Sequence, residues 1–100
     1  MIKHIVMWTL KEEALGKSGA ENAAEMKRML ETLEGKIPGL LHLEVGTDVF
    51  NASPAWQVVL YSEFATRADL AAYQPHPEHQ KCVQFISQVV SGRGVLDYEV

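Results

Sequence analysis

Cysteine is almost absent from this 100-residue sequence, since Cys82 is the single one. A lone cysteine cannot form a disulfide within the chain, which fits a protein kept in a reducing cytoplasm, and we predict that compartment. Cys82 lies in an apolar helical pattern, so we expect a buried, structural thiol. A role as a nucleophile would instead need an activated thiolate, for which His79, three residues earlier, is the one plausible helper.

Long apolar runs and runs of basic charge are missing as well. The apolar stretch at residues 5–10 is too short to span a membrane, and no small-residue cleavage site follows it, so we expect neither a membrane segment nor a signal peptide. The 9 basic and 13 acidic residues give a net charge of −4 and are mixed along the chain. Without a basic patch for phosphates, nucleic-acid binding is not expected.

Internal repeats, low-complexity tracts and interdomain linkers are also absent, which predicts a single domain over residues 1–100. Apolar residues make up 47% and charged residues 22% of the chain. These fractions are typical of a soluble globular protein.

Four segments have the composition and alternation of β-strands. Residues 2–10 carry large apolar side chains on both faces, which predicts that both faces are covered. In residues 40–49, Leu41 shares one face with the apolar side chains at alternate positions after it. Residues 56–64 are rich in β-branched and aromatic residues, and the short connection between these two strands predicts an antiparallel hairpin. Residues 95–100 form the last predicted strand.

Helices are expected between these strands. Ser18, followed three residues later by Glu21, matches a capping box that starts the first helix. We expect this helix to end at Gly35 and Pro38-Gly39. Its apolar stripe, which we interpret as core, consists of Met26, Met29, Leu30, Leu33 and Ile37. Thr66 is expected to cap a short second helix.

The predicted order of elements, β-α-β followed by β-α-α-β, is that of the ferredoxin-like fold. We therefore predict an α+β protein with a four-stranded antiparallel sheet and helices on one face. The other face of the sheet is also apolar, and a chain this short has no spare element to cover it. A second copy of the protein is the expected cover, sheet against sheet, in a homodimer.

The stretch Tyr73-Gln74-Pro75-His76-Pro77-Glu78-His79 is the part of the sequence most suited to chemistry. Pro75 cannot continue the helix before it, and Pro77 suits the first turn of a third helix, which Ser91–Gly94 is expected to end. The break allows a phenol and an imidazole on two helix ends to converge. Imidazole can take and return a proton near neutral pH, and a phenol can stabilise a developing oxyanion. Alternatively, His79 binds a backbone group near the break and Tyr73 packs over the helix junction.

Three parts of the sequence have a recognisable pattern: the opening strand Ile2–Trp8, the Tyr73…His76-Pro77-Glu78-His79 cluster and the closing Asp97-Tyr98. Together they resemble the stress-responsive dimeric α/β-barrel family. The resemblance runs over the whole chain, and the His-Pro-Xxx-His cluster with its upstream tyrosine is its most specific part. It implies a homodimer whose two sheets close into a barrel, with a small-molecule cavity between sheet and helices in each subunit. A plant polyketide cyclase in this family performs an aldol-type ring closure without a cofactor, so no cofactor is implied.

The resemblance also implies roles for individual residues. His79 would be the general base and Tyr73 its assistant, and His4 would be a further pocket histidine. Other pocket-lining positions implied in the same way are Val6, Trp8, Leu60, Cys82, Val83 and Phe85. On the first helix, where the cyclase has bulky aromatics, this chain has Met26, Lys27 and Leu30. We expect Met26 and Leu30 to contact the substrate, and the departure argues against a polyketide.

These observations leave several functions open. The first is a cofactor-free lyase or cyclase that acts on a small, partly apolar carbonyl compound. The second is a noncatalytic dimer that binds a small molecule or serves in stress tolerance. A cofactor-independent monooxygenase is a third, by analogy of fold. A metal site built from His76, His79 and His4 lacks recognisable ligand spacing, so no metal is expected.

Overall fold

The computed structural model describes residues 1–100, and its centre is a four-stranded antiparallel sheet with the strand order β4-β5-β1-β6. The strands are β1 (Ile2–Leu10), β4 (Leu40–Gly46), β5 (Val58–Phe64) and β6 (Val90–Glu99). β1 and β5 lie in the middle, and β4 and β6 form the two edges. This arrangement confirms the predicted ferredoxin-like α+β fold and the hairpin of β4 with β5.

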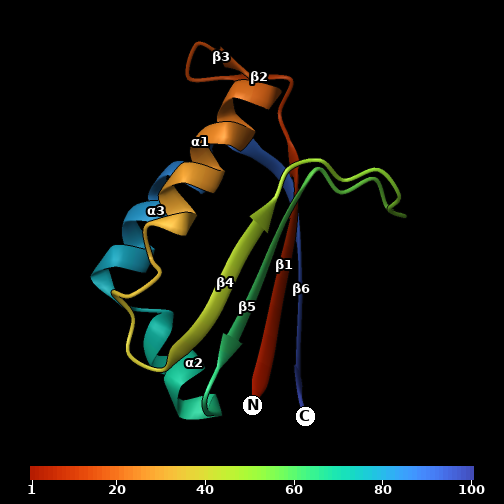
Figure 1. Cartoon of the computed structure of the whole chain (residues 1–100). Helices are drawn as coiled ribbons and strands as arrows, with labels where there is room; N and C mark the ends of the chain where they lie inside the picture. Colours follow the sequence, from red (N-terminus) through yellow and green to blue (C-terminus); the bar gives the residue numbers. More distant parts are fainter.

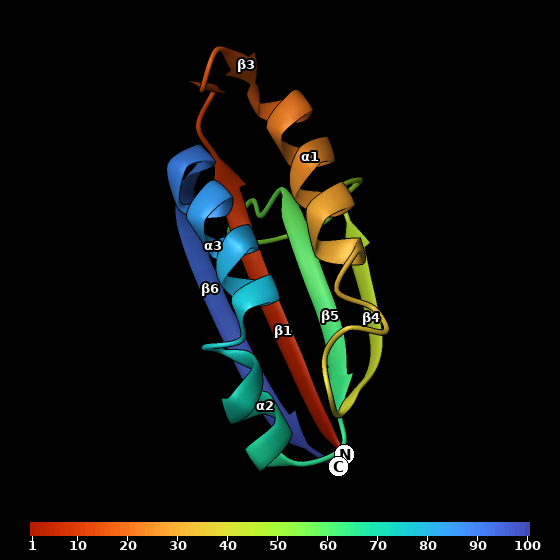
Figure 2. The ribbon, with the colours of Figure 1, turned by 90° about the vertical axis from the view of Figure 1, so that its left-hand side faces the viewer.

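Three helices cover one face of this sheet and leave the other face open (Figure 1). They are α1 (Gly19–Glu31), α2 (Arg67–Tyr73) and α3 (Pro77–Val89). Seen from the helical side, α1 lies on the β4–β5 half of the sheet and α3 on the β1–β6 half (Figure 2). A small hairpin of β2 (Glu13–Ala14) and β3 (Lys17–Ser18), which the sequence did not predict, precedes α1. None of the helices has the length and apolar character needed to cross a membrane.

The helices begin where the sequence predicts, because local side chains cap them. The Ser18 hydroxyl accepts a hydrogen bond from the Glu21 N–H, and the Glu21 carboxylate accepts one from the Ser18 N–H. Thr66 caps α2 in the same position. At α3, Nδ1 of His76 accepts from the Glu78 N–H, so His76 is the N-cap.

The core fills the layer between the sheet and the helices. Along β1, every second side chain from Ile2 to Leu10 is buried, and β5 alternates in the same way. Phe64, Met26 and Leu33 are each 0% exposed, which places the centre of the core under α1 and its C-terminal turn.

Helix α1 is shorter than predicted, since it ends at Glu31 rather than near Gly35. Leu33 and Ile37 are nevertheless buried. Two successive turns replace the α-helix here. The Leu33 N–H donates to the Leu30 carbonyl, and the Lys36 N–H donates to the Leu33 carbonyl. These turns keep both apolar side chains directed toward the core.

Strand β4 differs from the prediction at its start. The register with β5 shifts between Leu40 and His42, so Leu40 packs against the core and Leu41 is 58% exposed. The predicted inward position of Leu41 is therefore wrong, whereas Leu43 and Val45 are buried as expected. The strand ends at Gly46, and the residues after it form a loop.

Strand β6 begins at Val90, directly after α3, and not at residue 95. Gly92 and Gly94, which resembled turn residues, lie within the strand. A Cβ at Gly92 would come within 2.7 Å of the Thr9 hydroxyl, and one at Gly94 within 3.0 Å of Met7 and Trp56. Close neighbours, and not a turn, require glycine there.

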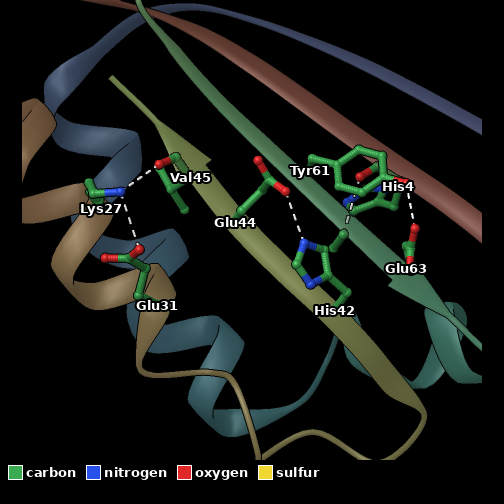
Figure 3. Close-up of polar contacts among 9 residues, drawn as sticks. His4, Lys27, Glu31, His42, Glu44, Val45, Tyr61 and Glu63 are labelled. Atoms are coloured by element: carbon green, nitrogen blue, oxygen red, sulfur yellow. Dashed lines mark hydrogen bonds and ion pairs between the residues drawn. The ribbon is translucent and has the colours of Figure 1, made fainter. Parts of the chain in front are cut away.

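The face of the sheet away from the helices has apolar side chains at its centre and polar pairs toward β4. Nothing in the chain covers Leu96 and Tyr98, which are 54% and 43% exposed. On the β4–β5 side, His42 lies 2.9 Å from Glu44, and the Tyr61 hydroxyl donates to Glu63 at 2.6 Å (Figure 3). The neighbouring carboxylate raises the pKa of Tyr61 to about 12.

Candidate functional site

A cavity of about 680 Å³ lies between α3 and the β1–β6 half of the sheet. Its volume is within the usual range for small-molecule sites. Of the residues that the sequence assigned to a site, the structure brings these to the cavity wall: His4, Val6, Trp8, Leu30, Leu60, Tyr73, His79 and Val83. The sequence did not point to Ile86, Ser87 or Arg93, which also line it.

Met26, Cys82 and Phe85 are not part of the cavity wall, in contrast to the prediction. On α3, Cys82 lies against Met29 of α1 and Phe85 packs on the core, while His79, Val83 and Ile86, at helical spacing, line the cavity. Met26 is 0% exposed within the core. The Cys82 thiol lies 3.7 Å from the carbonyl oxygen of Met29, and burial raises its pKa. Cys82 is therefore buried, as expected, and its thiol is protonated at neutral pH.

The proline break brings the tyrosine and the histidine together. Tyr73 is the last residue of α2, and His79 is the third residue of α3. Their ring centroids are 4.1 Å apart, with 40° between the ring planes. The convergence of phenol and imidazole predicted from the sequence is thus present, although the two rings meet at a tilt and form no hydrogen bond to each other.

The protonation state of His79 follows from its hydrogen bond. Its Nδ1 lies 2.9 Å from the carbonyl oxygen of Gln74, which can only accept, so Nδ1 carries the proton and Nε2 keeps a free lone pair. Burial lowers the pKa of the imidazole; the hydrogen bond to the Gln74 carbonyl opposes this, and the Arg93 guanidinium acts in the same direction as burial. His79 is therefore neutral at pH 7 and can accept a proton. It does bind a backbone group at the break, and that bond also fixes its tautomer.

The Tyr73 hydroxyl is a buried donor without an acceptor. The residue is 1% exposed, and no group in the chain bonds to its hydroxyl. Burial raises the pKa of this phenol well above its ordinary value of 10, so it stays protonated. A buried polar group left unpaired costs about 1–3 kcal/mol, and such groups are rare in native proteins.

His4 and Asp97 form a second polar pair at the cavity. They face each other across the β1–β6 ladder, and Nδ1 of the buried His4 contacts Oδ1 of Asp97. Like His79, His4 thus directs one ring nitrogen to a fixed partner. Its ring meets that of Tyr73 edge to face, with the centroids 6.3 Å apart. The sequence did not assign a role to Asp97, because only the strand register places it opposite His4.

The other histidines lie elsewhere. His76 is used as the cap of α3, and His42 is on the open face of the sheet with Glu44. No group of three or more His, Cys, Asp or Glu side chains in the chain is arranged to hold a metal ion.

A model of the stress-responsive A/B barrel domain matches residues 2–100. The chain belongs to this family. The resemblance noted in the sequence is thereby confirmed. A comparison with curated protein sequences finds no match.

Solved structures similar to this stress-responsive barrel include proteins with different descriptions. A dimeric ferredoxin-like protein of unknown function from Bacteroides fragilis is 30% identical, with a TM-score of 0.85, over 99% of this chain and 95% of that one. A hydroxynitrile lyase from Passiflora edulis is 16% identical, with a TM-score of 0.82, over 99% and 92%. A candidate antibiotic biosynthesis monooxygenase from Nitrosomonas europaea is 21% identical, with a TM-score of 0.79, over 100% and 98%. The last two share the fold.

Proposed function

We propose that this stress-responsive barrel protein is a cofactor-free enzyme of the lyase or cyclase type, which moves a proton on a small, partly apolar carbonyl compound held in the cavity. The Tyr73 hydroxyl carries the proposal. It is a buried donor that lacks an acceptor in the chain, and it belongs to a residue stacked on a neutral imidazole. A carbonyl oxygen of a ligand is the acceptor that this donor fits.

The proposed reaction begins with removal of a proton from the carbon next to the carbonyl. Nε2 of His79 takes the proton, the electrons of the C–H bond form a carbon–carbon double bond, and the carbonyl π electrons move to oxygen. The Tyr73 hydroxyl donates a hydrogen bond to this enolate oxygen. The enolate then attacks a second carbonyl, as in a cyclase, or expels a leaving group, as in a lyase. His79 returns its proton to the product.

Access to the hydroxyl involves the His79 ring, which covers that of Tyr73. This ring is only partly buried, and its one hydrogen bond is the 2.9 Å contact with the Gln74 carbonyl. A small rotation of the ring would admit a ligand oxygen to the phenol. His4, held by Asp97, would orient a further polar group of the ligand with its second ring nitrogen.

Deuterium exchange of a simple ketone tests the proton transfer without knowledge of the natural substrate. We expect the protein to accelerate exchange of the α-protons of 4-phenylbutan-2-one in heavy water, followed by proton NMR. His79→Gln should reduce the protein-dependent rate by about 10²–10⁴-fold, the usual contribution of a positioned acid–base group. Tyr73→Phe should also reduce it, because the enolate loses its donor.

His42→Gln is the matched control, because it makes the same substitution on the open face of the sheet and should leave the rate unchanged. Equal rates for the unmodified protein and His79→Gln would contradict the proposal. Binding of the ketone without any exchange would instead support noncatalytic small-molecule binding. That second function is favoured by one observation, the bond through which His79 braces the helix break. The similarity to the monooxygenase-type barrel rests on fold alone.

We also propose that the protein is a homodimer formed through the open face of the sheet. The similar structures from Bacteroides fragilis and Thermobifida fusca are described as dimeric. In this chain the same face exposes Leu96 and Tyr98, and an uncovered apolar sheet face is unfavourable in water. The cavity lies on the opposite, helical side of the sheet, so contact through the open face would not cover the helices that line it.

A further inference from the structure

Arg93 differs from the other arginines of the chain in having no carboxylate partner. Arg28 pairs with Glu25 at 2.5 Å, and Arg67 pairs with Glu99 at 2.7 Å. Arg93 takes part in none of the ion pairs or side-chain hydrogen bonds of the structure, and its side chain is exposed at the cavity wall. A guanidinium carries five donors in a planar fork and is always charged. Its charge at the cavity is therefore available to a ligand.

The position of Arg93 follows from the strand register. It pairs with Trp8 across the β1–β6 ladder. The register also pairs Val6 with Val95 and His4 with Asp97, so Arg93 lies on the same face of the sheet as the buried side chains of β1. Gly92 and Gly94 on either side face the opposite way, toward Thr9 and Met7. Arg93 thus belongs to the helix-facing wall of the cavity.

The cavity wall carries a free cation and no free carboxylate. The carboxylate next to the wall, Asp97, is paired with His4, and no Asp or Glu side chain lines the cavity itself. The ionisable groups that line it are Arg93, His4, His79 and Tyr73. The two rings that stack, Tyr73 and His79, are both uncharged at neutral pH. Between them and Arg93, the wall is largely apolar, with Trp8 and Ile86 among its residues. Arg93 itself is exposed, and a ligand that lies against this apolar wall would shield part of an ion pair with it from water, which strengthens the pair.

We propose that the cavity takes a ligand with a carboxylate, which the Arg93 guanidinium binds, while the other end of the ligand reaches Tyr73 and His79. This inference deepens the proposed function, since it names the ligand class of the same cavity. With a carbonyl at one end and a carboxylate at the other, the substrate class is an oxo acid with an apolar middle. A single guanidinium matches the one charge and the planar shape of a carboxylate better than a doubly charged phosphate.

A matched set of probes tests the charge preference directly. 4-Phenylbutyrate and 4-phenylbutyramide have the same apolar part and differ in charge, and 4-phenylbutylamine carries the opposite charge. Dissociation constants are measured from amide chemical shifts in ¹H–¹⁵N NMR titrations, which also show whether the probe lies in the cavity. We expect the carboxylate to bind about tenfold more tightly than the amide, because a hydrogen-bonded ion pair replaces a neutral contact.

Variants of Arg93 separate its role from general affinity. Arg93→Gln should bring the carboxylate to the affinity of the amide and leave the amide unchanged. Arg93→Lys should keep part of the preference, because the charge remains but the fork is lost. Arg93→Glu should reverse it in favour of the amine. Lys17→Gln, which removes one charge from the exposed β3, is the control and should keep the full preference.

Three results would each overturn the inference. The first is equal affinity of the unmodified protein for carboxylate and amide, and the second is failure of the carboxylate to shift the resonances of the cavity residues. The third is a carboxylate preference that persists in Arg93→Gln. These results are independent of proton transfer. His79→Gln should lower ketone exchange by the same factor of about 10²–10⁴ and still prefer the carboxylate. Absence of exchange in the unmodified protein, with its carboxylate preference intact, would therefore count against the proposed enzyme and not against the role of Arg93.

Discussion

Replacing Tyr73 with phenylalanine removes one oxygen atom and keeps the ring that packs between Phe64 and His79. In most proteins the loss of a buried tyrosine hydroxyl is destabilising, because its hydrogen-bond partner is left unpaired. Tyr73 has no partner to lose. We therefore expect Tyr73→Phe to make the ligand-free protein more stable, while it impairs the proposed proton transfer.

The magnitude follows from the cost of burying an unpaired hydroxyl, about 1–3 kcal/mol. Part of this gain is offset because the oxygen also makes van der Waals contacts in a residue that is 1% exposed. A net increase of about 1 kcal/mol in the free energy of unfolding is the expected result. For a domain of this size, that corresponds to a rise in Tm of about 4–8 °C.

The measurement is chemical and thermal unfolding of both proteins at the same concentration, so that any dimer contributes equally. Ser62→Ala is the control, because its buried hydroxyl does have a partner, the carbonyl oxygen of His4 at 3.2 Å, and does not lie on the open face. That variant should be less stable. A clear loss of stability in Tyr73→Phe, comparable to or larger than that in Ser62→Ala, would refute the assignment of the hydroxyl to a ligand and indicate a structural partner.

Three further predictions concern pH, assembly and metals. The pKa of His79 is lowered from 6.5 in the folded protein, so the unfolded chain binds this proton first as pH falls. The stabilisation that comes from keeping His79 neutral is therefore complete above pH 6.5, and it is lost as the pH falls through the folded-state pKa. His79→Gln should remove this part of the pH dependence of the free energy of unfolding. Leu96→Glu should dissociate the dimer in analytical ultracentrifugation, whereas Ala71→Glu, on the exposed side of α2, should not. A dimer that persists in Leu96→Glu would exclude the open face as the interface. Addition of EDTA should leave Tm unchanged, and a decrease of more than a few degrees would show that the histidines bind a structural metal.

The sequence predicted those features of the fold that depend on neighbours along the chain. Ser18, Thr66 and His76 each cap a helix through a residue two or three positions later, so the starts of all three helices follow from local spacing. The stacking of Tyr73 on His79 is local in the same sense, because the intervening prolines determine it.

The features that the sequence did not predict depend on residues far away in the chain. Asp97 lies next to His4 only through the register of β6 on β1, and the bulge that exposes Leu41 is set by pairing with β5. Arg93 lies between two glycines and looked like part of a turn. Those glycines are instead required by the closeness of Thr9, Met7 and Trp56, none of which is a sequence neighbour. The charged residue of the cavity was overlooked for that reason.

The turn between α2 and α3 also has a consequence for how this cavity can change. Tyr73 and His79 are positioned by the backbone at two helix ends. Val83 and Ser87 also line the cavity, and both are exposed, so they can be exchanged for larger or smaller side chains without disturbing the core. Mutations of the wall can therefore change which ligands the cavity binds without changing its two reactive side chains. A library at those two wall positions, screened with ketones of different size, should yield new preferences at little cost to folding.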